Sequence, residues 1–298
     1  MIIEQIHSSY IAFNPNHVIH TREYYLYVVQ LLKIWLANQN LTLNIILGNY
    51  NINFNNTNKT IKVDLQCEHT LVKDGGRSVS EKIFGNIKHD NGYYLVRIDK
   101  YNYFNSLDIV IDYSLANICN ISSSDKFNNF LSKIIYIAPA IYDINFNNDN
   151  KTDIIALFTK FGNDRRTNII TQLNKSHINI KIIENCFSKE CLLDLYGKTK
   201  IIINIHQTDH HHTFEELRVL PALLNGVIII SEECPLTNTI PYSDYIIWSK
   251  YGDIPSKTID IINNYSYYYK RLFIDGNLKN ILTDIKERNK IAFNGIKI

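Results

Sequence analysis

The segment KIIINIHQTDHHHTFEELRVLPALLNGVIIISEE, residues 200–233, decides how the second half of the chain folds. Its two apolar runs, residues 200–205 and 226–231, predict buried strands, because continuous apolar runs suit a sheet that is covered on both faces. Residues 214–225 carry apolar side chains at helical spacing and predict a helix between the two strands. A strand, a helix and a strand in close succession predict a parallel unit with a right-handed crossover.

The same alternation extends backwards from this segment. Residues 152–158 and 178–184 predict strands, and residues 167–176 and 188–199 predict helices. Strands and helices that alternate in this way, with short connections, predict a doubly wound α/β domain built on a parallel sheet.

The first half of the chain has a less regular pattern. Residues 22–38 predict a well-buried helix, and Asn-rich residues 49–60 predict a surface loop or a hairpin with a loose turn. Strands are predicted at residues 41–48, 61–67, 93–98 and 107–114, and a helix end followed by a strand at residues 127–142.

Residues 143–151 lack apolar periodicity and are the best candidate for a linker. The predicted organisation is therefore an α/β domain over residues 1–145, a second domain over residues 151–275, and a C-terminal helical segment over residues 276–298.

The composition is that of a soluble globular protein, with 45% apolar and 20% charged residues among 298. Lys and Arg number 31 against 29 Asp and Glu, so no global field recruits nucleic acid or an anionic membrane. Neither a membrane span nor a signal peptide is expected. The five cysteines form no CxxC pair, which predicts buried thiols in a reducing, cytoplasmic location. Abundant Ile, Asn, Lys and Tyr indicate an A+T-rich genome, such as that of a large DNA virus or a protist.

The loop after the strand at residues 200–205 lies where ligands bind in doubly wound sheets. Thr213 and Glu216 fit a capping box, although Glu216 is equally a candidate ligand contact. Pro221 removes an N–H, so the helix either kinks there or begins its regular part near Leu217. In both cases unpaired helix N–H groups would face the loop and suit an anion such as phosphate.

Four histidines in this loop raise the alternative of a metal site. His210, His211 and His212 are consecutive, however, and consecutive side chains on a loop point in divergent directions. His206 and Asp209 add possible ligands without adding a defined spacing. We expect no functional metal site here.

Gly162, Arg165 and Arg166 mark the first strand-to-helix turn of the second domain. Two arginines oppose the dipole at a helix start, and a bound diphosphate would explain them, because guanidinium groups grip phosphate oxygens bidentately. The alternative is a pair of solvated surface charges.

The first half carries its polar residues in two places. Asp112 follows a predicted strand, together with Ser114 and Asn117. The densest polar loop, residues 67–78, carries His69, Lys73, Asp74 and Arg77 around the pair Gly75 and Gly76, which permits close backbone approach. His69 is a candidate general base, although a lone histidine is more often structural. Serine hydrolases, P-loop NTPases and zincins lose support, since GxSxG, the P-loop and HExxH are absent from the sequence.

Residues 201–233 resemble the carboxyl-terminal donor-binding domain of GT-B glycosyltransferases. The resemblance is to family-1-like members with a pattern of the type LNIHYYE…LExxRIxEALxxGxxVISE. The matching positions of this chain are Asn204, His206, Glu215, Arg218, Gly226, Ser231 and Glu232. Pro221 stands where many relatives have a second glutamate, which leaves the usual glutamate pair incomplete.

The resemblance implies two Rossmann-like domains with parallel sheets that face each other across a cleft, and a last helix that crosses back to the first domain. It implies transfer of a sugar from a UDP- or GDP-sugar to a glycan or another hydroxyl acceptor, with no metal and no other cofactor. The implied catalytic residues are His69 and Glu215. The implied donor site comprises Gly162, Arg165, Arg166, Asn204, His206, Glu215, Glu216 and Arg218. The implied acceptor side comprises Glu68, Lys73, Gly75, Gly76, Arg77 and Asp112.

Two other hypotheses remain open from the sequence. One is a catalytically silent relative that kept the fold as a binding module, and Pro221 favours it. The other is a metal-dependent hydrolase built on the histidine cluster.

Overall fold

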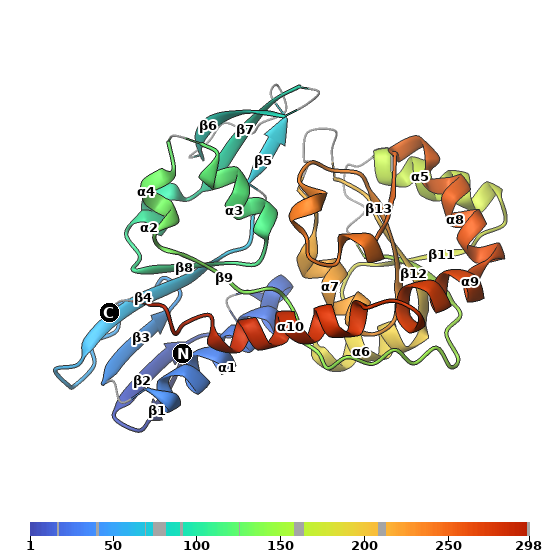
Figure 1. Ribbon diagram of the computed structural model, residues 1–298. Helices are drawn as coiled ribbons and strands as arrows, with labels where there is room; N and C mark the ends of the chain where they lie inside the picture. The colour runs from blue at the N-terminus through green and yellow to red at the C-terminus, as the bar shows by residue number, and fades with distance from the viewer. Residues whose placement is uncertain are drawn as a thin grey trace. The chain divides into compact units, whose positions relative to one another are not determined.

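The computed structural model describes residues 1–296, with the exception of residues 17, 40–41, 69, 74–81, 90–91, 125, 158–163 and 208–212. The chain forms two compact units. Unit 1 combines Met1–Ala138 with Lys286–Ile298, and unit 2 is Pro139–Ile285. Both units are α/β (Figure 1). Within the described part of the chain, no helix has the length and apolar character needed to cross a membrane.

Unit 1 contains a six-stranded mixed sheet in the order β1-β2-β3-β4-β8-β9. The strands are β1 (Ile2–Ile6), β2 (Ser9–Phe13), β3 (Leu43–Leu47), β4 (Lys59–Gln66), β8 (Ile109–Asp112) and β9 (Ile134–Tyr136). Only β1 and β2 of this sheet are antiparallel, and the other neighbours are parallel. The spatial order follows the chain order without a reversal, so this sheet has no topological switch point.

A smaller antiparallel sheet is inserted between β4 and β8, with the order β5-β7-β6. Its strands are β5 (Leu71–Lys73), β6 (Lys82–His89) and β7 (Gly92–Asp99). The α-helices of unit 1 are α1 (Arg22–Asn38), α2 (Tyr101–Asn105), α3 (Leu115–Ser122) and α4 (Asn128–Leu131).

The core of unit 1 joins α1 to the last residues of the chain. Trp35 of α1 packs against Phe293, with ring centroids 5.7 Å apart. The Asn289 side chain accepts a hydrogen bond from the backbone N–H of Ala138 at 3.1 Å and donates one to its carbonyl at 2.8 Å. Unit 1 is therefore completed by the C-terminal segment.

Unit 2 contains a five-stranded sheet in the order β11-β10-β12-β13-β14, with all neighbours parallel. The strands are β10 (Asp153–Leu157), β11 (Ile180–Ile183), β12 (Thr199–Asn204), β13 (Ile228–Glu232) and β14 (Ile247–Ser249). The chain moves from β10 to β11 on one side and then returns to β12 on the other. This reversal creates a topological switch point between β10 and β12.

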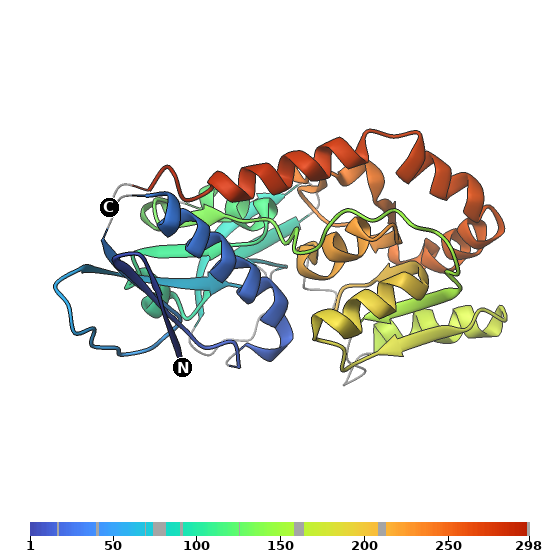
Figure 2. The same ribbon diagram turned by 90° about the horizontal axis from the view of Figure 1, so that it is seen from below.

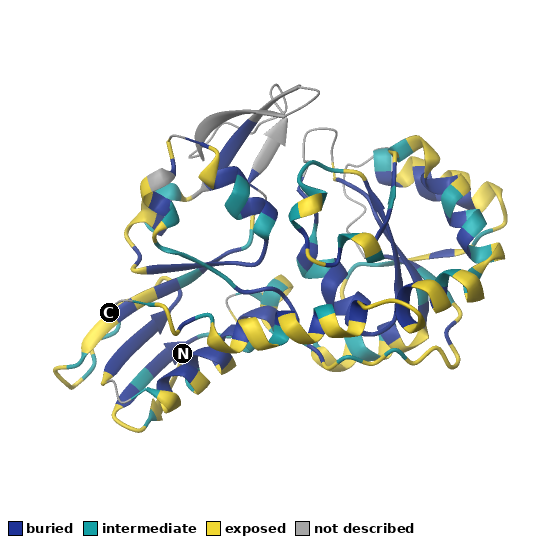
Figure 3. Cartoon of the chain, viewed as in Figure 1, coloured by how far each residue is buried: buried dark blue, intermediate teal, exposed yellow. Residues whose placement is uncertain are grey.

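Helices cover both faces of the unit 2 sheet (Figures 1 and 2). They are α5 (Asp164–Lys175), α6 (Lys189–Lys198), α7 (Glu216–Leu224) and α8 (Ile254–Asn263). Helices α9 (Tyr265–Tyr269) and α10 (Leu278–Ile291) follow α8 along the chain. The division between the two units falls inside α10, after Ile285. The interior strands β12 and β13 are buried along almost their whole length, as expected from their continuous apolar runs (Figure 3).

Lys151 and Gly226 lie at the C-terminal ends of helices α6 and α7. Lys151 is buried and donates hydrogen bonds to the carbonyls of Tyr196, Asn225 and Gly226, at 3.1, 2.7 and 3.1 Å. Burial lowers the pKa of Lys151 to about 8. Gly226 has a φ of +65°, and a Cβ there would lie 3.0 Å from the Tyr269 hydroxyl.

Several sequence predictions are confirmed and others are wrong. The predicted parallel α/β arrangement of the second half is present, and the helix at residues 22–38 has the predicted bounds. The hairpin alternative for residues 49–60 is wrong, because β3 and β4 are parallel. The capping box is also wrong. Helix α7 begins at Glu216, with Glu215 at its N-cap and no side-chain cap hydrogen bond.

The cysteines depart from the predicted free thiols. Cys186 and Cys191 form a disulfide between the β11–α6 connection and the first turn of α6. Cys67, Cys119 and Cys234 are free and partly buried, and burial raises the pKa of each thiol.

Candidate functional site

The strongest candidate site lies at the carboxyl end of the unit 2 sheet. Strand β12 ends at Asn204 and the neighbouring strand β13 ends at Glu232, while α5 is the helix that follows β10 along the chain. This is the switch-point edge, where open parallel sheets bind their ligands. Two chains of hydrogen bonds start from Asn204 and Glu232.

The first chain holds Arg165 in an ion pair. Its guanidinium donates to both carboxylate oxygens of Glu232, at 2.9 and 2.7 Å, and lies over the Tyr251 ring, 4.1 Å from the centroid. Glu232 also accepts from the backbone N–H of His206 at 3.1 Å, and its Oε2 lies 3.6 Å from His206 Nδ1. The sequence predicted that Arg165 binds phosphate, and the structure shows that its Nη1 and Nη2 atoms already bond to a carboxylate.

The surroundings of Glu232 favour its ionised form. Burial acts to raise its pKa, but the hydrogen bonds and charge of Arg165, together with His206, outweigh burial. The pKa of Glu232 is therefore held below its usual value of 4.5.

The second chain orients Arg218, which projects from α7. Its Nη1 donates to Asn204 Oδ1 at 2.9 Å, and Asn204 Nδ2 donates to Ser231 Oγ at 2.9 Å. Asn204 and Ser231 are buried, whereas Arg218 is partly exposed. The two neighbouring strand ends therefore hold the guanidinium of a residue that is partly exposed.

Arg166 is buried between these two chains. Its Nε and Nη2 donate to the carbonyl of Ile205, at 3.2 and 3.1 Å, so the interpretation as a solvated surface charge is wrong. Burial lowers the pKa of Arg166 to about 10, and the charges of Arg218 and Arg165 act in the same direction. Glu215 and Glu232 oppose this shift. Three guanidinium groups and two carboxylates therefore interact here, which leaves one positive charge in excess, and a bound anion would suit that excess.

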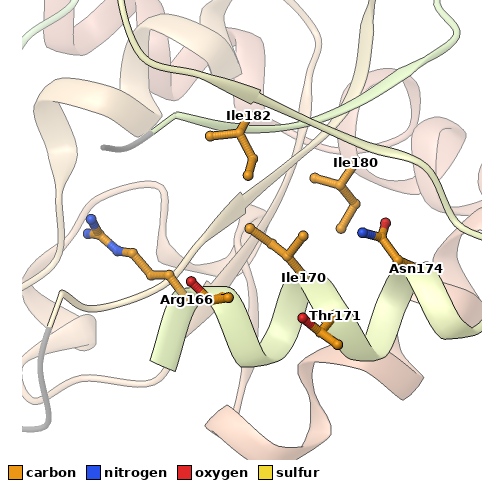
Figure 4. A pocket seen from close by; sticks show the side chains of 7 residues that line it. Arg166, Ile170, Thr171, Asn174, Ile180 and Ile182 are labelled. Carbon is orange, nitrogen blue, oxygen red and sulfur yellow. The ribbon is translucent and has the colours of Figure 1, made fainter. Parts of the chain in front are cut away.

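Arg166 also lines an open hollow of about 470 Å³ beside α5 (Figure 4). The other lining residues come from α5 and from the edge strand β11: Thr167, Ile170, Thr171, Asn174, Ile180 and Ile182. The hollow has a mixed lining of three isoleucines and four polar or charged residues, with Arg166 at one end (Figure 4).

The two glutamates at the start of α7 have different environments. Glu216 is fully buried and accepts a 2.7 Å hydrogen bond from the Tyr242 hydroxyl, which places it in the core. Glu215 is partly exposed and within electrostatic reach of Arg166. The backbone N–H of Glu216 bonds to the Phe214 carbonyl, so the first helix N–H groups are less available than predicted.

Unit 1 has a second polar cluster, where β4 and β8 end. Asp112 is buried, and its Oδ1 accepts from the Ser114 N–H at 2.9 Å and from Asn117 Nδ2 at 3.1 Å. Asn117 in turn bonds to the backbone on both sides of residue 69, at the Glu68 carbonyl and the Thr70 N–H. Asp112 therefore lies in a network that fixes this loop, and only Glu68 is exposed to solvent.

Other predicted site residues fall outside the described part of the chain. They are His69, Gly75, Gly76, Arg77, Gly162, Asp209, His210, His211 and His212. Lys73 is the last residue of β5. Across the described residues there is no group of three or more His, Cys, Asp or Glu side chains that could hold a metal ion, and the histidine cluster is not among them.

Sequence reasoning assigned no role to Glu232, Ser231 or Tyr251 in this site. Ser231 and Glu232 fall on positions of the glycosyltransferase pattern, and that likeness was the available signal. No sequence pattern marks Tyr251, because it is far from Arg165 along the chain and contacts it only in the folded structure.

Comparison with known proteins finds one informative likeness. No protein-family model matches the chain. An uncharacterized protein of Acanthamoeba polyphaga mimivirus is 31% identical over 205 residues, which cover 63% of this chain and 69% of that protein. A viral relative fits the genome type indicated by the composition. Because the relative is itself uncharacterized, it brings no activity to this chain.

Proposed function

The chain belongs to the same family as this uncharacterized mimivirus protein, and we propose that it is a glycosyltransferase of the GT-B type. In this proposal the enzyme moves a sugar from a nucleoside diphosphate sugar to a hydroxyl group of a glycan or another acceptor. Unit 2 binds the donor, unit 1 binds the acceptor, and no metal is required.

One observation carries the proposal. Five positions of the glycosyltransferase pattern join in two hydrogen-bonded chains at the switch-point edge of a parallel sheet: Asn204, His206, Arg218, Ser231 and Glu232. Residues that match a pattern in sequence therefore also meet in space, at the edge where such sheets bind ligands.

The chemistry of the edge suits a diphosphate. We assign Arg218 the direct contact, because Asn204 orients its guanidinium while part of it stays exposed. Arg166 adds a buried positive charge nearby, and negative charge that develops on the leaving diphosphate would be stabilised by both groups. Arg165 has a supporting role, since Glu232 holds it. Glu215 remains the candidate contact for the donor sugar or its ribose.

A thermal-shift screen tests the donor site. UDP, GDP and their sugar conjugates are expected to raise the melting temperature, since they bind the folded state. Arg218→Ala should abolish the shift. Arg271→Ala removes an exposed arginine of the same unit, outside the candidate site, and should retain the shift. The proposal fails if no nucleoside diphosphate stabilises the protein, or if Arg218→Ala keeps the full shift.

A catalytically silent binding module is the second candidate. Pro221 lies inside α7 where the pattern has a glutamate, and Arg165 is engaged by Glu232. A panel of radiolabelled sugar nucleotides, offered with mixed glycan acceptors, separates the two candidates. Labelled product supports the transferase, whereas nucleotide binding without product or hydrolysis supports the module.

A further inference from the structure

Strand β1 forms one edge of the unit 1 sheet (Figure 1). It pairs with β2 along one side only. The outer side of an edge strand presents a row of backbone N–H and C=O groups, which is a template for pairing with another strand.

The other edges of the two large sheets carry features that oppose edge-to-edge pairing, and β1 carries none of them among the residues that the structure describes. Strands β9 and β14 have only three residues each, and β11 carries the exposed Lys181. Short strands and lysines are common devices against edge-to-edge pairing. Strand β1 has five residues in regular register with β2, without proline, lysine or a bulge.

Apolar side chains flank the open edge on both faces of the sheet. Ile2 is 41% exposed and Ile3 is 53% exposed. Successive strand residues point to opposite faces, so one isoleucine is exposed on each face. A strand added at this edge would remove both side chains from water, which is favourable.

The charge of β1 is neutralised within its own unit. Glu4 is the only acidic or basic residue of the strand, and it forms a 2.6 Å ion pair with Lys33 of α1. A second strand that approaches this edge therefore meets no uncompensated carboxylate, even when that strand has the same sequence.

We propose that β1 is a contact between two copies of this chain. The two β1 strands pair in antiparallel fashion about a twofold axis and join two six-stranded sheets into one. A twofold contact is self-complementary, so the same isoleucines are covered and the same edge groups are bonded on both copies. This inference is independent of the proposed catalytic activity.

Sedimentation velocity on the full chain tests the contact over about a hundredfold range of concentration. The wild-type protein should reach twice the mass of one chain. Ile3→Lys places a lysine on the edge and should weaken dimerisation by more than about tenfold. Ile274→Lys makes the same change at an exposed isoleucine of unit 2 and should leave the dimer intact.

A second measurement uses no variant. Amide hydrogen exchange of β1 should slow as the wild-type concentration rises, because pairing protects the edge N–H groups. A wild-type protein that is monomeric at every concentration overturns the proposal. A dimer that Ile3→Lys leaves unchanged, or whose formation does not alter exchange in β1, also overturns it.

Discussion

Both units have polar side chains clustered where parallel strands end, but the two clusters differ in charge and in the topology of the sheet edge. In unit 1, amides and hydroxyls surround the buried Asp112 and bond to the nearby backbone. In unit 2, the cluster contains Arg165, Arg166 and Arg218, and its edge is a topological switch point. The unit 1 cluster has a complete structural role, that of fixing a loop.

The comparison separates two reasons for polar residues at a sheet edge. Asn117 accepts a hydrogen bond from the Thr70 N–H and donates one to the Glu68 carbonyl, so it stabilises the folded backbone around residue 69. Arg218 is held by Asn204, is partly exposed as a residue, and lies within electrostatic reach of Arg166. Only this second cluster has an excess of positive charge, which would suit an anion. The contrast can be tested by substitutions in both units.

Removal of the Asp112 carboxylate should have the largest effect. Asp112→Ala leaves buried donors of Ser114 and Asn117 without this acceptor, and should lower the free energy of unfolding by about 3 kcal/mol. Asp112→Asn keeps one acceptor oxygen and should cost about 1 kcal/mol. The measurement is denaturant unfolding followed by tryptophan fluorescence.

The two tryptophans make this test specific to each unit, because Trp35 lies in unit 1 and Trp248 in unit 2. A Trp248→Phe background therefore reports on unit 1. An Asp112→Ala variant as stable as wild type would contradict the structural role of the unit 1 cluster.

Glu232→Gln should destabilise unit 2 by about 2 kcal/mol near neutral pH, since it breaks the ion pair with Arg165. The pKa of Glu232 is lower in the folded state than in the unfolded chain, so its contribution is complete above about pH 4.5 and is lost as the pH falls through the folded value. The stability difference between wild type and Glu232→Gln should therefore shrink in acid. In a Trp35→Phe background, the fluorescence of Trp248 reports the unfolding of unit 2. If the stability difference between the Glu232 protein and Glu232→Gln grows below about pH 4.5, the ion pair does not stabilise the fold as described.

Gly226→Ala should destabilise unit 2 by about 1–2 kcal/mol, because its φ is positive and the added Cβ meets Tyr269 and Phe146. Gly197→Ala is the matched control in helix α6. A Cβ at Gly197 has no neighbour within 4 Å, and alanine should be neutral or slightly stabilising. Thermal unfolding distinguishes the two. Equal losses in both variants would show that the backbone at residue 226 is not special.

Lys151 should give the smallest effect, and one that depends on pH. Its folded pKa of about 8 lies below the unfolded value of 10.5, so burial of the charge costs stability in full below about pH 8. That cost is relieved as the pH rises. Relative to Lys151→Met, wild type should therefore gain about 1 kcal/mol between about pH 7 and pH 9. A relative loss over this range would contradict the buried charge.

Sequence patterns predicted the parallel sheet of unit 2 because its strands are continuous apolar runs and its connections are short. They did not predict the β1–β2 hairpin. Its turn uses His7 at a φ of 53°, and no glycine or Asn-Gly pair marks it. The mixed sheet of unit 1 was therefore only partly foreseen.

The partners within the site could not be read from the sequence either. Arg165 and Glu232 are 67 residues apart and meet only because α5 begins beside the end of β13. Glu216 has the spacing of a capping residue, yet the helix starts late and Tyr242 holds it in the core. Patterns along the chain report local periodicity, whereas these roles depend on which strand ends become neighbours.

The discontinuity of unit 1 has a consequence for biosynthesis. Residues 1–138 leave the ribosome first, but the Asn289 and Phe293 contacts with that segment can form only after residues 286–298 have also emerged. Unit 2, an uninterrupted stretch, has everything it needs earlier. The segment made first should thus be the last to mature, and a released chain truncated after residue 285 should leave it open to protease while unit 2 resists digestion.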